Sequence, residues 1–334
     1  MRAWVLDAPR PIEERPLSLR ELPDPVPGPG EIAVDIECCG LCRTDLHLVE
    51  GELPLAVAPI VPGHQAVGRV AKSGGSGGRF PVGARVGVAW LHRTCGACAA
   101  CARGEENLCP RALFTGYHRP GGLAERLVVP EAFAYELPGG LDPVRAAPLL
   151  CAGIIGYRAL KRAGLGSGET VGLYGFGSSA HLALQLARAS GNRVFVVTRG
   201  ERHRALARRM GAAWVGDSGE APPEPMDRAV VFAPAGELLP RALESVRWGG
   251  TVVSACVHMS PVPELDYGRH LFGERVLTST TANTRRDGEE LLELAASAGI
   301  RAEVETFPFE AANEGLLAIR RDAIAGSAVL VVRR

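Results

Sequence analysis

Four cysteines lie close together in residues 95–109, with the spacing C-x2-C-x2-C-x7-C. Four thiolates at such short intervals suit a closed, tetrahedral zinc site that fixes a loop and leaves no coordination position open for chemistry. An iron–sulfur cluster also uses four cysteines, but we find no electron-transfer partner for it elsewhere in the chain. The spacing therefore predicts a structural zinc ion. Its expected ligands are Cys95, Cys98, Cys101 and Cys109.

A glycine-rich turn fits G-x-G-x-x-G/A and stands between an apolar strand-like run and a helical run. Glycines at these places permit a tight turn and let a pyrophosphate approach the helix N-terminus, where amide dipoles favour an anion. We therefore expect a nicotinamide dinucleotide here. The expected contacts are Gly175, Phe176, Gly177, Ser178, Ser179 and Ala180.

The strand after this turn ends without an acidic residue anywhere in residues 194–200. Enzymes that prefer NAD place a carboxylate there to bind the ribose 2′-hydroxyl. Instead the chain has Thr198, which can donate to a phosphate, and Arg199 and Arg202, which can pair with one. NADP(H) is therefore the favoured cofactor, with NAD(H) as the alternative.

Three further segments carry a cysteine or a histidine: GLCRTDLH around Cys42, PGHQ around His64 and PLLCAG around Cys151. Their order and spacing, with the four-cysteine lobe between the second and third, resemble the zinc-dependent alcohol dehydrogenases of the medium-chain dehydrogenase/reductase (MDR) family. The resemblance runs over essentially the whole chain. It implies a second, catalytic zinc held by these three residues, with the fourth place left to water or a substrate oxygen.

The resemblance also implies the reaction, in which alcohol and NAD(P)⁺ give an aldehyde or ketone and NAD(P)H. An alcohol must lose its proton before its carbon can release hydride. Lowering its pKa by roughly 8 to 9 units takes about 12 kcal/mol at 1.36 kcal/mol per unit. A zinc-bound alkoxide can supply stabilisation of that order.

By the same resemblance, Thr44 takes the substrate proton first, and His47 passes it to solvent through the cofactor ribose. Asp45 orients the ligand His64, and partners of this kind matter for metal affinity. For His47 the alternative is a plain surface histidine.

Other matches are Arg43, at a position that contacts the cofactor pyrophosphate, and Trp90, the bulky pocket residue of the branch preferring small primary alcohols. Core packing is the alternative for Trp90. The chain departs from the family at Gln65, where glutamate is usual, and at Ile155, where relatives often carry a threonine. Gln65 removes a negative charge behind the zinc, which should make the metal slightly more electrophilic.

The expected substrates are small to medium primary or secondary alcohols and the matching aldehydes. A quinone or enone reductase of the same fold is one alternative, although such relatives lack these cysteines. A non-catalytic relative is the other. A dithiol redox site at Cys39 and Cys42 would need Cys42 free, whereas the zinc site uses it.

The elements that must position these residues follow two patterns. The first part of the chain reads as short strands and turns, irregular and β-rich and without a helical period, with a surface loop at residues 74–78. Beyond about residue 146, strands alternate with helices, which is typical of a parallel sheet with crossover helices. Strands are expected at residues 170–174, 193–197, 229–232, 251–255 and 276–279, and helices at 180–189 and 202–210.

The fold class is therefore α/β, and the resemblance implies a GroES-like β-rich catalytic domain joined to a Rossmann domain with a doubly wound parallel sheet. The expected domains are residues 1–147 with the zinc lobe at 95–109, residues 148–282 for NAD(P) binding, and residues 283–334 returning to the catalytic domain. This last part should contain a helix, a strand, a second helix and a final strand at 329–332.

The 334-residue chain has 37 basic and 37 acidic residues and no basic block, so neither nucleic acid nor a membrane surface is an expected partner. The N-terminus lacks the apolar core of a signal peptide, which predicts a cytoplasmic protein. In that compartment nine cysteines favour metal ligation over disulfides. The resemblance further implies a homodimer or homotetramer.

Overall fold

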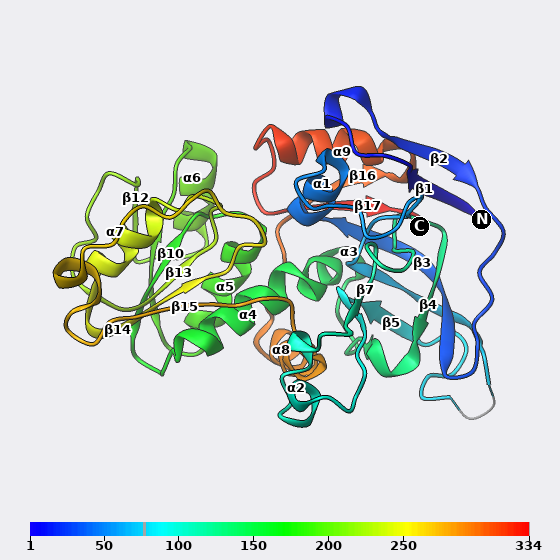
Figure 1. Cartoon of the computed structure of the whole chain (residues 1–334), viewed down its shortest axis with the longest axis horizontal. Helices are drawn as coiled ribbons and strands as arrows, with labels where there is room; N and C mark the ends of the chain where they lie inside the picture. The colour runs from blue at the N-terminus through cyan, green and yellow to red at the C-terminus, as the bar shows by residue number, and fades with distance from the viewer. Residues whose placement is uncertain (76–77, 334) are drawn as a thin grey trace. The chain divides into compact units, whose positions relative to one another are not determined.

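The computed structural model describes residues 1–75 and 78–333, so Ser76 and Gly77 of the expected surface loop lie outside it. The chain divides into two compact units (Figure 1). The first comprises Met1–Cys151, Ala282–Ala296 and Arg301–Arg334, and the second comprises Ala152–Thr281 and Ser297–Ile300. The functional boundaries given above remain predictions, because compactness does not show which unit binds the cofactor. Within the described ranges no helix has the length and apolar character of a membrane span.

The first unit is built on a seven-stranded sheet with the order β16-β17-β3-β4-β5-β9, to which β8 adds by pairing with β3. These strands are β3 (Glu31–Leu41), β4 (Ala66–Ser73), β5 (Arg85–Val88), β8 (Arg126–Pro130), β9 (Ala134–Glu136), β16 (Val304–Pro308) and β17 (Ser327–Val331). Two two-stranded antiparallel sheets accompany this sheet, β1 (Arg2–Leu6) with β2 (Leu17–Glu21) and β6 (Leu91–Arg93) with β7 (Leu113–Phe114). The helices are α1 (Arg43–Glu50), α2 (Ala99–Ala102), α3 (Pro143–Ala146), α8 (Arg285–Ala298) and α9 (Ala312–Arg320).

Strand β3 is the centre of this sheet, since it pairs antiparallel with β4, β8 and β17. Its side chains Ile32, Val34 and Ile36 are fully buried, as expected for an alternating strand whose inward face meets the core. The strand ends at Leu41, one residue before Cys42. Because β3 is hydrogen-bonded to three other strands, its end is held in place, and the first expected zinc ligand follows directly after it.

The first part of the chain, expected to be β-rich and without a helical period, also contains helix α1, which carries Thr44, Asp45 and His47. Its N-cap is Cys42, whose Sγ accepts a hydrogen bond from the Thr44 N–H while the Asp45 carboxylate accepts from the Cys42 N–H. Ser, Thr, Asp and Asn are the usual N-cap residues. A capping box that begins with cysteine therefore does not mark the start of this helix in the sequence. The helix ends at Gly51, which is left-handed with φ 82°.

The second unit is a six-stranded, all-parallel sheet with the order β12-β11-β10-β13-β14-β15 (Figure 1). Numbered along the chain, this is 3-2-1-4-5-6, the Rossmann order, so the expected fold class is confirmed. The strands are β10 (Thr170–Tyr174), β11 (Arg193–Val197), β12 (Trp214–Gly216), β13 (Met226–Val231), β14 (Val246–Ser254) and β15 (Val276–Ser279). The helices are α4 (Ala152–Ala163), α5 (Ser178–Ala189), α6 (Glu201–Arg209) and α7 (Leu238–Ser245).

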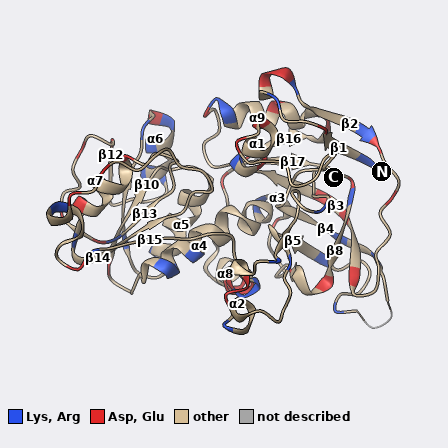
Figure 2. Cartoon of the chain, in the orientation of Figure 1, with Lys and Arg blue, Asp and Glu red and all other residues tan. Residues whose placement is uncertain are grey.

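Acidic and basic residues are mixed along each unit and do not gather by sign (Figure 2). Several form ion pairs at the surface, such as Arg204 with Asp217 and Arg247 with Asp227. Exposed pairs of this kind contribute little to stability.

Candidate functional site

The sulfur atoms of Cys42 and Cys151 and a ring nitrogen of His64 converge in the first unit, all within 4.8 Å of one another. Cys42 stands between β3 and α1, His64 lies just before β4, and Cys151 follows a 3-10 turn at Ala147–Leu150. The two sulfurs are 4.0 Å apart. Tetrahedral ligands at a zinc–sulfur distance of about 2.3 Å would stand about 3.8 Å apart, so the observed spacing fits zinc.

Asp45 fixes two of these three residues. Its carboxylate accepts hydrogen bonds from the Cys42 N–H at 2.8 Å, the Gly63 N–H at 3.2 Å and His64 Nδ1 at 3.1 Å. An ionised carboxylate only accepts, so His64 Nδ1 must carry the proton and Nε2 is left with the lone pair that a metal needs. Asp45 is 2% exposed, which protects this arrangement from water.

The local charges favour metal binding. The neighbouring Cys151 thiol lowers the pKa of Cys42 well below its usual value by donating to the thiolate, and His64 acts in the same direction. Next to that thiolate, the pKa of Cys151 is raised well above its usual value. Burial opposes a charge on His64, but Asp45 and Cys42 outweigh it and raise the pKa to about 10. The site therefore holds one thiolate, at Cys42, and protons at Cys151 and His64. A divalent cation that binds there displaces those protons.

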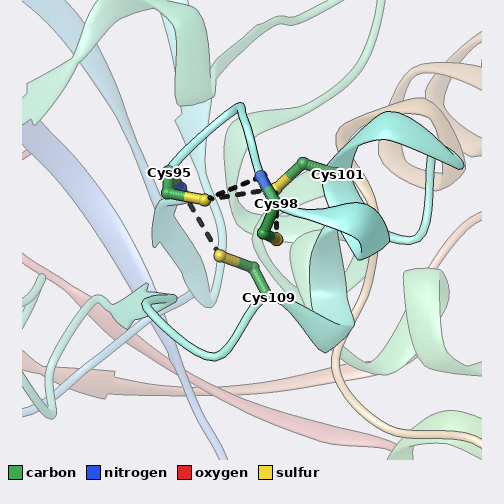
Figure 3. A group of neighbouring side chains, drawn as sticks. All are labelled: Cys95, Cys98, Cys101 and Cys109. Atoms are coloured by element: carbon green, nitrogen blue, oxygen red, sulfur yellow. Dashed lines mark hydrogen bonds between the residues drawn. The ribbon is translucent and has the colours of Figure 1, made fainter.

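The second cluster lies in the cysteine lobe, where Figure 3 shows four side chains whose sulfur atoms face one another. They come from Cys95, Cys98, Cys101 and Cys109, and their ligand atoms lie within 4.8 Å. The sulfurs of Cys98 and Cys101 are 3.5 Å apart. Backbone N–H groups of Ala97 and Cys98 donate to Cys95 and lower its pKa to about 5. All nine cysteines are free of disulfides, and these four fit a closed zinc site.

Trp90 contacts the first cluster directly. Its ring meets the ring of His64 edge-on, with centroids 4.9 Å apart and planes at 74°. Phe114 stacks against Trp90 at 5.0 Å, and Tyr117 stacks at 5.9 Å. The sequence indicated Trp90 but not its two aromatic neighbours, because no local pattern connects residues so far apart.

Thr44 and His47 lie on the same helix as Asp45, and both are buried. The Thr44 hydroxyl lies 3.6 Å from Cys42 Sγ. His47 Nδ1 is hydrogen-bonded to the carboxylate of Glu52, a residue that sequence reasoning did not single out. Gln65 is buried beside β3, against Gly40, and Arg43 is on the surface, where its guanidinium donates to the Ile319 carbonyl oxygen.

Residues 28–139 match the family described as "Alcohol dehydrogenase GroES-like domain", and residues 180–297 match "Zinc-binding dehydrogenase". The probable alcohol dehydrogenase AdhA of Mycobacterium tuberculosis is 45% identical over 337 residues, which cover 99% of this chain and 97% of that protein. The chain belongs to the zinc-containing alcohol dehydrogenases of the MDR family. An alcohol dehydrogenase of Geobacillus stearothermophilus is 36% identical over 329 residues, which cover 96% of this chain and 97% of that protein.

Solved structures agree with this membership. The cobalt- and zinc-bound thermostable alcohol dehydrogenase of Pyrobaculum aerophilum has a TM-score of 0.89 and 26% identity, over 99% of each chain. Acetophenone reductase of Geotrichum candidum in complex with NAD has a TM-score of 0.88 and 26% identity, over 99% of this chain and 97% of its own. A Helicobacter pylori enzyme complexed with NADP(H) has a TM-score of 0.87 over 99% of each chain, but its 22% identity shows the fold alone.

The protein is thus a zinc-dependent oxidoreductase that acts on alcohols with NAD(P), and the alternatives of a quinone reductase and a non-catalytic relative are set aside. The four-cysteine cluster is its structural zinc site, and the Cys-His-Cys group is its catalytic one. Structures of the same fold contain either NAD or NADP.

In the second unit of this alcohol dehydrogenase, the glycine turn follows β10 directly. Gly175 has φ 86°, and a Cβ there would lie 2.8 Å from the backbone nitrogen of Ala233, so only glycine fits without a shift. Gly177 is the N-cap of α5, and the turn therefore leads into a helix N-terminus as expected. Cofactor binding by the whole run remains a prediction, with the same residues named above.

At the end of β11 the side chains differ in exposure. Thr198 is 6% exposed, and its hydroxyl donates to the Arg199 carbonyl oxygen at 3.4 Å. Arg199 and Arg202 are exposed. The two guanidinium groups are therefore the more accessible candidates for a 2′-phosphate.

Proposed function

We propose that this alcohol dehydrogenase oxidises small to medium primary or secondary alcohols, and reduces the matching aldehydes and ketones, with NADP(H) as its preferred cofactor. The observation that carries the proposal is the convergence of Cys42, His64 and Cys151 beside the Thr44 hydroxyl and the Trp90 ring. Three metal-ligand atoms, a hydroxyl that can accept a proton and an aromatic ring therefore lie together in the first unit.

The assigned metal ligands are Cys42, His64 and Cys151. Zinc bound there would act as a Lewis acid that makes the alcohol hydroxyl more acidic and polarises the carbonyl in the reverse reaction. The protein's own contribution is to hold these ligands in place. Asp45 does this by fixing the backbone of Cys42 and the tautomer of His64.

Thr44 and His47 form the proposed proton relay. Thr44 Oγ1 takes the hydroxyl proton of the alcohol and gives up its own proton, and His47 then accepts a proton at Nε2 and releases it to bulk water. Burial of both side chains keeps bulk water away from the reacting hydroxyl, so proton loss follows the relay. General acid–base groups of this kind contribute roughly 10²- to 10⁴-fold to a rate.

Trp90 limits the substrate. Because it is held between His64 and the rings of Phe114 and Tyr117, it cannot swing away easily, and a rigid indole next to the reacting hydroxyl favours unbranched alcohols. A screen of primary and branched alcohols of increasing size tests this, and preference for bulky secondary alcohols would contradict it.

The preference for NADP(H) rests on the absence of an acidic residue in 194–200 and on the exposed Arg199 and Arg202. Comparing kcat/KM for NADPH and NADH tests it, with Arg199→Ser expected to weaken NADPH use selectively. A clear preference for NADH would overturn the assignment.

Metal analysis tests the two zinc assignments separately. Cys42→Ala should lose one zinc per chain and all alcohol-dependent cofactor reduction, whereas Cys101→Ser should lose the other zinc and lower the melting temperature. The matched control is Cys38→Ala, which removes a buried thiol outside both clusters and should keep both ions. Wild-type activity in Cys42→Ala would refute the catalytic assignment.

A homodimer or homotetramer and a cytoplasmic location complete the proposal, and sedimentation and cell fractionation test them. Neither is needed for the metal and proton chemistry described above.

A further inference from the structure

The cysteine lobe (residues 95–109) is joined to the start of helix α8 by an ion pair (Figure 1). The Glu106 carboxylate accepts hydrogen bonds from the Arg285 N–H at 2.7 Å, from Nε at 3.2 and 3.1 Å and from Nη2 at 2.9 Å. The Glu106 side chain is only 11% exposed. Because a buried charge needs partners of this kind, the pair holds the lobe against the helix.

On the lobe side, Glu106 belongs to the same short turn as a zinc ligand. The 3-10 turn Glu106–Leu108 ends at Cys109, whose N–H donates to the Glu106 carbonyl oxygen at 3.1 Å. The preceding residue, Glu105, donates its N–H to the Ala100 carbonyl oxygen of α2 at 2.9 Å. A zinc ion held by the four cysteines would therefore fix the backbone from which the Glu106 side chain extends.

On the helix side, Glu106 completes the N-terminus of α8. The first N–H groups of a helix have no acceptor within it, and a negative charge is favoured there. Thr284 Oγ1 accepts from the Asp287 N–H, whereas the first N–H of the helix, that of Arg285, has its acceptor in the lobe. The chain re-enters the first unit at Ala282, so the lobe supplies a partner for the returning segment.

The guanidinium group of Arg285 is also held on the side of the sheet. It lies 4.6 Å from the centre of the Phe133 ring, and Nη1 donates to the Ala132 carbonyl oxygen at 3.4 Å. Phe133 is part of the buried core of the first unit. Because the core holds Arg285 and the zinc-binding turn holds Glu106, order at one end of the pair favours order at the other.

We propose that Glu106 couples zinc binding in the cysteine lobe to the order of the first turn of α8, with Arg285 as its partner. Without the ion, the turn before Cys109 loosens, the Glu106 carboxylate leaves Arg285, and the first turn of α8 frays. Linkage is reciprocal, so breaking the pair must weaken zinc binding by the lobe. The inference rests on the assignment of the lobe as a zinc site, and it concerns two residues that the sequence did not indicate.

The first test measures zinc affinity in the intact, zinc-loaded protein. After competition with a chelator, alkylation of the freed thiols, read by mass spectrometry, reports the lobe separately from Cys42 and Cys151. We expect about 10-fold weaker zinc binding by the lobe in Glu106→Ala and in Arg285→Ala, the scale of losing hydrogen bonds to a charged group. The double variant should also lose about 10-fold and not the product of the two, because the two residues act as one pair.

The second test follows amide hydrogen exchange in the peptide that contains residues 284–288. Exchange there should be about 10-fold faster in Glu106→Ala and in Cys101→Ser, which cannot hold the zinc of the lobe. Exchange in β10 of the second unit should stay at the wild-type rate, which separates local fraying of α8 from global unfolding.

The matched controls are Glu105→Ala in the lobe and Arg286→Ala in the helix. Glu105 pairs with Arg103 inside the lobe, and Arg286 pairs with Glu290 inside α8. Neither pair crosses from the lobe to the helix, so both variants should keep wild-type zinc affinity and wild-type exchange at the start of α8.

The inference is overturned if Arg285→Ala leaves the zinc affinity of the lobe unchanged, or if the start of α8 exchanges at the wild-type rate in Cys101→Ser. A fall in melting temperature with unchanged zinc affinity would show that the pair is merely structural. A wild-type lobe that holds no zinc is a separate result, which would refute the metal assignment and the coupling with it.

Discussion

Asp45→Asn should weaken zinc binding at the catalytic site while leaving the fold in place. The carboxylate accepts three hydrogen bonds, with one oxygen bonded to the Cys42 N–H and the other to the Gly63 N–H and His64 Nδ1. An asparagine has one accepting oxygen and one NH₂ group, so whichever way the amide turns, two donors face each other at one side.

The magnitude follows from those contacts. One buried donor loses its acceptor, which costs about 1 to 3 kcal/mol of folding free energy. Loss of an oriented, negatively charged partner behind a metal-binding histidine typically lowers metal affinity about 10- to 100-fold, or about 1.4 to 2.8 kcal/mol. Zinc affinity should therefore fall by one to two decades.

The chain offers a matched control at α8. Asp287 is 1% exposed and accepts hydrogen bonds from the N–H and the hydroxyl of Thr284 in a capping box like that of Cys42 and Asp45. Asp287→Asn should cost similar folding free energy without touching either zinc cluster.

Competition between the protein and a zinc chelator gives the affinity, and urea unfolding of the same samples gives the stability. We expect weaker zinc binding in Asp45→Asn alone and comparable destabilisation in both variants. Equal zinc affinity in the two variants would refute the argument that Asp45 acts through His64.

Three further outcomes are expected. Gly175→Ala should weaken NADPH binding, measured by fluorescence titration, and lower the melting temperature, because its Cβ would meet neighbouring backbone at 2.8 Å and φ is 86°. Gln65→Glu should change steady-state turnover by no more than about 100-fold, the range for groups behind a metal ligand; a larger loss would contradict this. Burial lowers the pKa of His92 and of His181 to about 4, below the usual 6.5, so the folded state favours the neutral rings. Their stabilisation is present above pH 6.5 and is lost as the pH falls toward 4, so urea unfolding should show about 2 kcal/mol less stability per ring at pH 5 than at pH 7.

Part of the Rossmann unit could be predicted from the sequence: β10, β11 and β15 have the expected bounds, whereas β13 and β14 begin earlier than expected and β12, α4 and α7 were not predicted. Central parallel strands are buried on both faces, so β10 and β11 appear in the sequence as short apolar runs bounded by turn residues. The turn after β10 could also be predicted, because its first residue must be glycine. At Gly175 the backbone is left-handed, and any side chain would collide with Ala233.

Helix α1 could not be predicted in the same way. Its N-cap is a cysteine, which is not a usual capping residue. Its buried apolar residues are interspersed with buried polar ones at the metal ligands, which obscures the hydrophobic periodicity of a helix. The contacts of Glu52 with His47 and of Phe114 with Trp90 depend on how the chain turns back on itself. Glu52 follows His47 by five residues, a spacing that does not place two residues on one face of a helix. Phe114 follows Trp90 by 24 residues, and no local sequence pattern predicts a contact over that distance.

The pairing of β17 with β3 has a consequence for the order of events during synthesis. The strand that leads to Cys42 is made early, yet one of its neighbours in the sheet is residues 327–331, which are made long after all three ligands have left the ribosome. A growing chain therefore displays Cys42, His64 and Cys151 before the platform beneath them is complete. The sheet that ends at the first metal ligand therefore gains its β17 neighbour only after the C-terminal strand has been made.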